Sequence, residues 1–555
     1  MGNDERGRPV GVVGSGVMGT GIAQVALDAG ERVVLYGRRA TALQAAREGL
    51  AERLRRREAS GRAEPGGAAE RLARLRLTTD LSELRDARLV VESVAEDFAA
   101  KADLLRRVEA VVPGDSLIAT NTSSLSVTGL AAALRRPERF AGLHFFNPAP
   151  AMRLVEVVAA RGTAEATCAA LSQTARRWGK APVRSAARPG FVVNRIARPY
   201  YGEALRALEE GAADPATIDA VLTEAGGFRM GPFALMDLIG NDVNEAVTRG
   251  LWRAFHHDPR YTPSQVQREL VEAGHLGRKV GRGFFDYPAG PAGPAESPAP
   301  ATWPPVLPPS DGPAGAAVRA RGDLGPAEPL VRLLREAGVE VAVDGARPPG
   351  QPPTLELPDG TLLRLTDGRT AGEHARETDR PVGLLDLSHD YRAASRLALA
   401  FDDRCPAAAR AEAVRLLQRL GKAVTELDDL PGLLVFRTVA MLVNEAADAV
   451  LHRIAAPDDV DSAMRLGANH PAGPLEWGDR VGPRRVLRLL ENLGDHYRDG
   501  RYRPSPLLRR RSLADLPLRA GRVPHPHPHP LHTTHPLHAA PPPIPAPDPA
   551  PAKGA

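Results

Sequence analysis

A glycine-rich loop near the start of the chain constrains the fold more than any other feature. The short apolar segment 8–13 runs directly into the sequence GSGVMG, and a helical pattern follows through Ala29. In a strand–loop–helix unit the first glycine permits a tight turn, the second lets the backbone approach a pyrophosphate, and the third allows close helix–strand packing. The N-terminus of the helix then offers free N–H groups and the positive end of its dipole to phosphates. The loop residues that we expect at these phosphates are Gly14, Gly16, Val17, Met18 and Gly19.

Strand-like and helix-like segments alternate over the first 186 residues. Such alternation is typical of a parallel sheet covered by helices on both faces, so residues 1–186 are predicted to form an α/β dinucleotide-binding Rossmann domain. A long stretch rich in Arg, Glu and Ala, from about Thr41 to Leu75, is expected to be helical throughout. The other expected strands are 32–36, 88–92, 116–120 and 140–145.

The pattern changes after Pro189, where apolar residues recur at helical spacing as far as Tyr287. This spacing predicts an all-α domain behind the α/β domain. Segments rich in Pro, Gly and Ala are typical of linkers, and Pro-rich polar sequence cannot bury a core. The predicted segments are an all-α domain at 187–287, a linker at 288–328, a degenerate α/β segment at 329–430, a second helical domain at 431–516 and a disordered His/Pro-rich tail at 517–555.

The second helical domain is an internal copy of the first. The sequence PGFVVNRIARPYYGEAL begins at residue 189 and PGLLVFRTVAMLVNEAA begins at residue 431, an offset of 242. Glu203 corresponds to Glu445 at this offset, and a later Gly-Pro pair recurs without a gap. Matches of this extent indicate a duplicated helical domain. Asn194 of the first copy is replaced by Phe436, so we expect the second copy to have kept the scaffold and lost the site.

Composition excludes several classes of protein. The chain has 555 residues, too many for one ordinary core, and its two cysteines, Cys168 and Cys405, are too few for a disulfide framework or a cysteine zinc site. Acidic residues are interspersed with the basic ones and the net charge is only +5, which argues against nucleic-acid binding. No apolar run approaches the ~20 residues that span a bilayer, and the polar start lacks the apolar core of a signal peptide. We therefore expect a cytoplasmic protein without a metal site, a membrane partner or a nucleic-acid partner.

The end of the second expected strand bears on the choice of dinucleotide. A carboxylate at this point usually holds the ribose 2′-hydroxyl of NAD, but the sequence here is Tyr36-Gly37-Arg38. Gly37 in place of an acid removes a group that would repel a 2′-phosphate, and Arg38 would attract one. NAD is the expected cofactor, and the missing acid predicts tolerance of NADP.

A histidine and a glutamate lie in two successive apolar segments of the first domain. His144 is expected at the end of a strand rather than on a helix face, and Glu156 lies twelve residues later in a second apolar strand. A histidine beside a carboxylate is the usual pair for removing a hydroxyl proton while hydride leaves the same carbon. The pair is compatible with dehydrogenase chemistry, but a histidine near a glutamate is more commonly just a satisfied polar residue, so the pair alone does not establish that function.

Eight sequence motifs follow one another over residues 8–287. They are GSGVMGTGIA, VVESVAEDFAAK, NTSSLSVT, RFAGLHFFNP, LVEVV, RPGFVVNR, MGPFALMDLIG and GRKVGRGFFDY. In order and spacing they resemble the 3-hydroxyacyl-CoA dehydrogenases, in which a Rossmann domain precedes a helical domain similar to that of 6-phosphogluconate dehydrogenase. The C-terminal repeat resembles the longer bacterial members that act on 3-hydroxybutyryl-CoA or 3-hydroxyadipyl-CoA.

The resemblance implies a role for individual residues. His144 would be the general base with Glu156 as its orienting partner, while Ser123 and Asn194 would bind the 3-oxygen and the thioester region of an acyl-CoA. Single-repeat members resemble one another in dimerising through their helical domains, so this chain could be a monomer with an internal pseudo-dimer of helical domains, or a homodimer. Besides Arg38 and the glycine loop, the residues expected at the cofactor are Glu96, Lys101, Asn121, Asn147 and Lys279.

Two other functions stay open at this point. A β-hydroxyacid dehydrogenase that does not use CoA would share the architecture, and a non-catalytic dinucleotide-binding regulator would need only the glycine loop. Ser123 could instead serve as a turn former, and Asn194 as a helix cap.

Overall fold

The computed structural model describes residues 7–61, 66–287, 317–344 and 352–520, which contain two β-sheets and two sets of helices. The first sheet has eight strands in the order β3-β2-β1-β4-β5-β6-β7-β8. Neighbouring strands are parallel except β6 and β7, which run antiparallel. The strands are β1 (Val10–Val13), β2 (Val33–Tyr36), β3 (Leu75–Thr78), β4 (Leu89–Glu92), β5 (Leu117–Thr120), β6 (Phe140–Phe145), β7 (Leu154–Ala159) and β8 (Ala181–Ala186).

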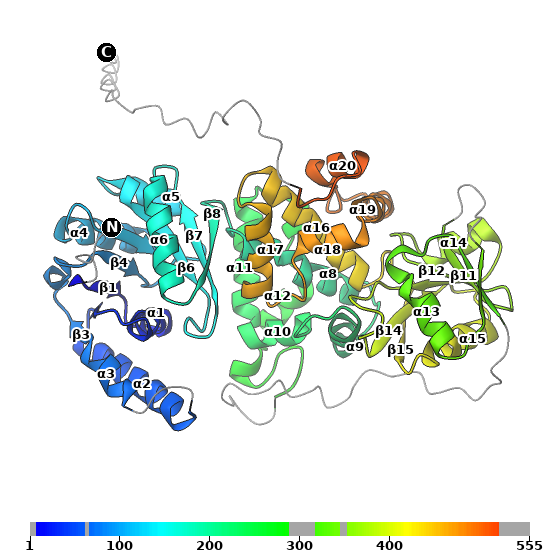
Figure 1. Cartoon of the computed structure of the whole chain (residues 1–555), viewed down its shortest axis with the longest axis horizontal. Coiled ribbons are helices and arrows are strands. Elements are labelled where there is room, and N and C mark those ends of the chain that lie inside the picture. Colours follow the sequence, from blue (N-terminus) through cyan, green and yellow to red (C-terminus); the bar gives the residue numbers. More distant parts are fainter. Residues whose placement is uncertain (1–6, 62–65, 288–316, 345–351, 521–555) are drawn as a thin grey trace, which may run out of the picture. The chain divides into compact units, whose positions relative to one another are not determined.

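Helices cover both faces of this first sheet (Figure 1). On one face Val12 shares a core with Ile22 and Leu171, and on the other face Val13 shares a core with Leu105. Burial on both faces explains why β1 is apolar without alternation. This arrangement confirms the predicted Rossmann-type domain. Its helices are α1 (Val17–Asp28), α2 (Ala40–Ala59), α3 (Gly67–Ala73), α4 (Phe98–Val111), α5 (Val127–Ala132) and α6 (Glu165–Arg177).

The long helix predicted as far as Leu75 is wrong at its C-terminal end. Leu75 begins strand β3, which pairs in parallel with β2 so that Leu75 lies opposite Val33. The Arg- and Leu-rich composition favours a helix, but the open edge of β2 supplies backbone partners, and Leu75 and Thr78 become buried there. Pairing with a distant strand outweighs local propensity at this position.

The helical domain is duplicated, as predicted. In the first copy Asp219 accepts the backbone N–H groups of Phe233 and Ala234, and in the second copy the equivalent Asp461 accepts those 14 and 15 residues later in the same way. The first copy contains α7 (Val193–Ile196), α8 (Arg198–Glu209), α9 (Pro215–Ala220), α10 (Pro232–Ile239), α11 (Asn241–Ala254) and α12 (Gln265–Glu272). The second contains α16 (Val435–Leu451), α17 (Pro457–Gly467), α18 (Pro474–Val481), α19 (Pro483–Tyr497) and α20 (Pro506–Leu513).

The two helical copies pack against each other through α8 and α16, and their buried charges are exchanged reciprocally. Arg195 of the first copy donates to Glu445 of the second at 3.2 Å, and Arg437 of the second donates to Glu203 of the first at 2.7 Å. Arg437 is equivalent to Arg195 and Glu445 to Glu203, so each copy supplies the same pair to the other. Each carboxylate also accepts a tyrosine hydroxyl. The contact between the two helical copies is therefore reciprocal, with the same arginine and glutamate used from each side.

A second sheet joins the two helical copies in sequence. It has seven strands in the order β10-β9-β11-β12-β13-β14-β15. Its first strand lies within residues 288–328, so the predicted linker is too long at its C-terminal end. The strands are β9 (Val318–Arg321), β10 (Val341–Asp344), β11 (Thr354–Glu356), β12 (Leu362–Leu365), β13 (Val382–Leu385), β14 (Arg396–Phe401) and β15 (Ala423–Leu427); the helices beside them are α13 (Pro329–Glu336), α14 (Ala371–Thr378) and α15 (Ala407–Gln418).

The C-terminal end of the described chain extends slightly beyond the predicted start of the tail at residue 517. Leu518 is buried, and its N–H donates to Asp479 at 2.6 Å. The first residues of that predicted tail thus belong to the second helical domain, and residues 521–555 lie outside the described part of the chain. Among the described residues no helix combines the length and apolar character needed to cross a membrane.

Candidate active site

A cavity of 1380 Å³ lies between the glycine loop, the carboxyl ends of the first sheet and the first helical copy. Its wall extends from the loop that follows strand β1 to helices α8, α10 and α11. The cavity brings together most of the residues singled out from the sequence. Those in its wall are Gly14, Gly16, Val17, Met18, Arg38, Glu96, Lys101, Asn121, Ser123, His144, Asn147 and Asn194.

The three glycines of the loop differ in what an added side chain would contact. Gly14 has a φ of 120°, and a Cβ added there would overlap the carbonyl of Ser93. A Cβ on Gly19 would overlap the carbonyl of Gly14, so helix α1 can approach the strand only because Gly19 lacks a side chain. A Cβ on Gly16 would meet no protein atom within 4 Å. The space beside Gly16 at the N-terminus of α1 therefore fits a phosphate group held by backbone N–H groups.

His144 lies in the wall of the cavity and forms a buried pair with Glu156. They face each other across the antiparallel strands β6 and β7, with Nδ1 of His144 2.7 Å from Oε2 of Glu156. The His144 side chain is 7% exposed and that of Glu156 is 1% exposed. Because Glu156 occupies Nδ1, Nε2 is the ring nitrogen that remains to accept a proton. The rings of Phe146 and Phe191 pack against the imidazole and fix its plane.

The same carboxylate links this pair to the start of the helical domain. Oε1 of Glu156 accepts the backbone N–H groups of Val192 and Val193, each at 3.0 Å. These groups begin helix α7, which carries Asn194 on its first turn into the cavity wall. Asn194 does not cap the helix, since its N-cap is Val192 and no side chain caps it. Glu156 therefore orients the imidazole and the helix start that bears Asn194 together.

Ser123 follows strand β5 and lies in the cavity wall. Its backbone N–H donates to Glu96 at 3.2 Å, and Glu96 also accepts the hydroxyl of Thr122 at 2.8 Å. The turn itself is stabilised by Thr122, whose hydroxyl accepts the N–H of Leu125. The turn-forming role thus belongs to Thr122, and the Ser123 side chain is available to a ligand. Asn121 accepts the N–H of Phe145 and ties this loop to the strand of the histidine.

The two lysines expected at the cofactor differ in position. Lys101 lies in the cavity wall, but its ammonium group is buried and donates to Glu92 at 2.6 Å. Lys279 pairs with Asp242 at 2.6 Å and is not among the residues of the cavity wall. Neither lysine therefore points a free charge into the cavity in this structure.

Other parts of the wall were not expected from the sequence. Leu238, Ile239 and Val243 are apolar yet 41–50% exposed, and they line the cavity at the junction of α10 and α11. Segment 467–470 of the second helical copy also reaches this wall, as does the buried Arg198. Only the fold brings these residues together. The sequence shows the apolar run at the end of α10, but only the structure shows that its side chains are exposed.

The second copy repeats the scaffold of this site without its reactive groups. Strand pairing places Asp386 next to Ala398, at the positions that His144 and Glu156 occupy in the first copy. The offset is again 242, so the duplication extends back into the first sheet. Asp386 is buried and accepts the N–H groups of residues 434–436, and burial raises its pKa to about 6. At this position a helix-capping carboxylate replaces the imidazole.

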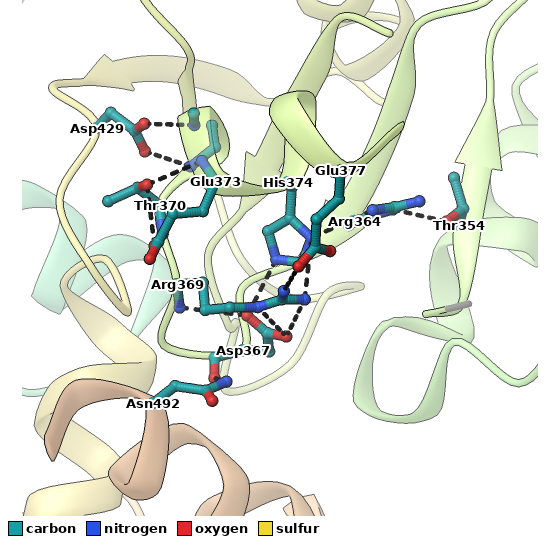
Figure 2. Close-up of polar contacts among 12 residues, drawn as sticks. Thr354, Arg364, Asp367, Arg369, Thr370, Glu373, His374, Glu377, Asp429 and Asn492 are labelled. Atoms are coloured by element: carbon teal, nitrogen blue, oxygen red, sulfur yellow. Dashed lines mark hydrogen bonds and ion pairs between the residues drawn. The ribbon is translucent and has the colours of Figure 1, made fainter. Parts of the chain in front are cut away.

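The loop that carries Ser123 is also replaced in the second copy. The pairing of β12 with β13 matches that of β5 with β6, which makes Asp367 the equivalent of Ser123. Figure 2 shows Asp367 between the side chains of His374, with Nε2 at 3.0 Å, and Arg369, with Nη2 at 3.2 Å. The bonds from His374 and the nearby arginine hold the pKa of Asp367 well below its usual range. This carboxylate is engaged within the protein, so the second copy has a structural cluster where the first has an open site.

Comparison with known proteins agrees with this geometry. Family models described as "3-hydroxyacyl-CoA dehydrogenase, NAD binding domain" and "3-hydroxyacyl-CoA dehydrogenase, C-terminal domain" match residues 9–188 and residues 190–287 and 432–521. A third, "3-hydroxybutyryl-CoA dehydrogenase reduced Rossmann-fold domain", matches residues 363–431. The last region is the one that the sequence indicated as a degenerate α/β segment.

Individual relatives match in sequence and structure. The 3-hydroxyadipyl-CoA dehydrogenase of Escherichia coli K12 is 42% identical over 506 residues, which cover 91% of this chain and 98% of the relative. A 3-hydroxybutyryl-CoA dehydrogenase of Mycobacterium tuberculosis is 39% identical over 280 residues, covering 50% of this chain and 98% of the relative. The crystal structure of an E. coli K12 3-hydroxybutyryl-CoA dehydrogenase superposes with a TM-score of 0.79 at 41% identity, covering 91% of this chain and 98% of that one. The chain belongs to the 3-hydroxyacyl-CoA dehydrogenase family of NAD-binding oxidoreductases.

Proposed function

We propose that this enzyme oxidises the 3-hydroxyl of an (S)-3-hydroxyacyl-CoA to the 3-oxoacyl-CoA, with NAD as the hydride acceptor. The observation that carries the proposal is His144, which lies in the wall of the same cavity as the dinucleotide loop and is paired with the buried Glu156 behind it. A base with its free nitrogen toward a cavity that also fits a dinucleotide can deprotonate a hydroxyl while hydride leaves the same carbon. The names of the relatives make 3-hydroxybutyryl-CoA and 3-hydroxyadipyl-CoA the first substrates to test.

The protein's own groups act on the substrate hydroxyl. His144 accepts the hydroxyl proton on Nε2, and the imidazolium that forms is stabilised by Glu156 at Nδ1. Ser123 and Asn194 are proposed to donate hydrogen bonds to the 3-oxygen, where negative charge develops in the reverse reaction, and to the thioester carbonyl. When bound, NAD supplies the hydride-accepting ring. The exposed Leu238, Ile239 and Val243 offer an apolar surface to the acyl-CoA chain.

The loop and strand ends support a cofactor proposal. Space beside Gly16 fits the pyrophosphate, and Glu96, Asn121 and Asn147 in the same wall are proposed to hold the rest of the dinucleotide. At the ribose end, Gly37 provides no carboxylate, and Arg38 lies in the wall. We therefore expect NAD to be used and NADP to be tolerated.

The proposal includes a dimer-like helical interface formed within one chain and a cytoplasmic location. The reciprocal Arg–Glu pairs between α8 and α16 support a chain that forms its dimer-like helical interface internally. Both cysteines are free and buried, which is consistent with a reducing cytoplasm.

The test is the oxidation of NADH, followed at 340 nm with acetoacetyl-CoA as substrate, for the wild type and for His144→Ala. We expect the variant to lose about 10²- to 10⁴-fold in kcat with little change in KM, as is usual when a general base is removed. Wild-type-like turnover by the variant would refute the assignment of the base. Repeating the wild-type assay with NADPH measures the cofactor preference, and a preference for NADH above about 100-fold would overturn the expected tolerance of NADP.

A further inference from the structure

Arg198 is a buried cation in the cavity wall that has no acidic partner among the described residues. It is 7% exposed, and no described carboxylate lies within ion-pair distance of its guanidinium group. Its Nε donates to the backbone carbonyl of Asn194 at 3.0 Å and its Nη1 donates to the hydroxyl of Thr248 at 3.2 Å. An arginine has five N–H donors, so these two neutral partners leave donors free.

This situation differs from that of other buried arginines in the helical pair. Arg195, Arg260 and Arg437 each contact a carboxylate of the opposite copy. Burying a guanidinium without a counter-charge is costly, and burial lowers the pKa of Arg198 accordingly. A position of this kind is stabilised when an anionic ligand enters the cavity.

Comparison of the two helical copies shows which of these residues are kept in both copies and which occur only in the first. Arg195 has its equivalent in Arg437, which makes the same interface contact in the second copy. Arg198 has its equivalent in Ala440, and Asn194 in Phe436. Arg198 therefore changed together with the residues of the site, not with the residues of the interface.

Arg198, Asn194 and His144 lie in the wall of the same cavity, so an acyl chain whose C3 is at His144 can extend toward the guanidinium. Arg198 is one helical turn beyond Asn194, a rise of about 6 Å, and its bond to the carbonyl of Asn194 draws the side chain back toward the site. A carboxyl carbon three bonds beyond C3 lies about 4 Å from it, and a charge-assisted N–H···O bond adds about 3 Å. The neighbouring wall residue His470 is no competing cation, since burial lowers its pKa to about 3.

We propose that Arg198 is the residue that binds a carboxylate at the far end of the acyl chain, and that it selects carboxylate-ended over methyl-ended acyl-CoA substrates. The proposal rests on the acyl-CoA dehydrogenase function proposed above. Arg198 then acts as a specificity-determining residue: it pairs with the terminal carboxylate and fixes how deeply the acyl chain enters. A methyl-ended chain of the same length leaves the guanidinium with only its neutral partners, the Asn194 carbonyl, the Thr248 hydroxyl and the Tyr201 ring.

The experiment compares kcat/KM for 3-oxoadipyl-CoA and 3-oxohexanoyl-CoA, which have equal chain length but end in a carboxylate and a methyl group. A hydrogen-bonded charge pair is worth about 1.5–3 kcal/mol, so the wild type should prefer the carboxylate-ended substrate by about 10- to 150-fold. Arg198→Met should remove most of this preference by losing activity on 3-oxoadipyl-CoA while keeping activity on 3-oxohexanoyl-CoA. Arg249→Met, on α11 outside the cavity wall, is the matched control and should leave both values unchanged.

The outcomes are distinguishable. Equal kcat/KM values for the two substrates in the wild type would overturn the role of Arg198 without requiring any variant to fold. An Arg198→Met enzyme that loses both activities equally, with an unchanged melting temperature, would also overturn it. If the wild type reduces neither substrate and no acetoacetyl-CoA, the proposed dehydrogenase function itself fails.

Discussion

Replacing Glu156 by glutamine tests what the buried carboxylate does for His144. Glu156 Oε2 holds Nδ1 of His144 at 2.7 Å, while Oε1 accepts the N–H groups of Val192 and Val193. Glutamine has nearly the same shape, and its oxygen can still accept from the two backbone groups, so its NH₂ group turns toward Nδ1. His144 then accepts at Nδ1 and carries its proton on Nε2, where it cannot remove the hydroxyl proton of the substrate.

The magnitude follows from these contacts. A hydrogen bond to a charged group is worth about 1.5–3 kcal/mol, so its loss from the imidazolium state lowers the rate about 10- to 150-fold. The wrong tautomer adds to this loss; in serine proteases the corresponding carboxylate-to-amide change lowers kcat about 10⁴-fold. We expect kcat of Glu156→Gln to fall about 10²- to 10⁴-fold, with little change in KM for (S)-3-hydroxybutyryl-CoA, when NAD reduction is followed at 340 nm.

The second copy offers a matched control. Asp386 occupies the position equivalent to His144, and it caps the start of α16 through the N–H groups of residues 434–436. Asp386→Asn should lower the melting temperature, since a buried amide NH₂ would face backbone donors, but it should leave kcat unchanged. A Glu156→Gln enzyme with kcat within about threefold of the wild type and an unchanged melting temperature would refute the reasoning.

Three further predictions concern the loop, the interface and pH. Gly16→Ala should weaken NADH binding at least about 10-fold in a fluorescence titration and leave the melting temperature unchanged. Gly19→Ala should instead lower the melting temperature, because its Cβ overlaps a carbonyl. The opposite pattern would contradict the roles assigned to the two glycines. Glu445→Gln breaks the buried cross-copy ion pairs and should lower the free energy of unfolding by about 3–5 kcal/mol in urea, so a change below about 1 kcal/mol would argue against their importance. Burial raises the pKa of Asp461 to about 6, so this carboxyl stabilises the fold below pH ~4 and the contribution is lost as pH rises through 6. The stability of the wild type relative to Asp461→Asn should therefore fall by about 2–3 kcal/mol between pH 4 and pH 7, and a flat difference would show that the pKa is not raised.

The strand–loop–helix arrangement of the glycine loop could be predicted from the sequence because its signals are local. The glycine loop, the strand that precedes it and the strand end at Gly37 are contiguous, so spacing alone indicates what they contact. His144 and Glu156 required more, since only the antiparallel pairing of β6 with β7 brings them face to face. Here the family resemblance supplied the long-range contact that spacing could not.

Features that depend on distant packing could not be predicted. Strand β3 was missed because its Leu- and Arg-rich sequence favours a helix until the edge of β2 is available. The equivalence of Asp386 with His144 could not be predicted because the two side chains differ. Only the matching strand pairing in the structure shows that the positions correspond. Nothing in the sequence distinguishes Arg198 from the many other arginines. Its burial and its neutral hydrogen-bond partners are evident only in the structure.

The measurement that tests the central claim most directly is the dependence of NAD reduction on the CoA thioester. The wild-type protein would be assayed at 340 nm with (S)-3-hydroxybutyryl-CoA, with (S)-3-hydroxyadipyl-CoA and with free 3-hydroxybutyrate. We predict reduction of NAD with at least one of the thioesters, at a kcat/KM of about 10⁴ M⁻¹s⁻¹ or more, and little or none with the free acid. Efficient oxidation of the free acid together with no oxidation of either thioester would contradict the account and point to a β-hydroxyacid dehydrogenase that does not use CoA.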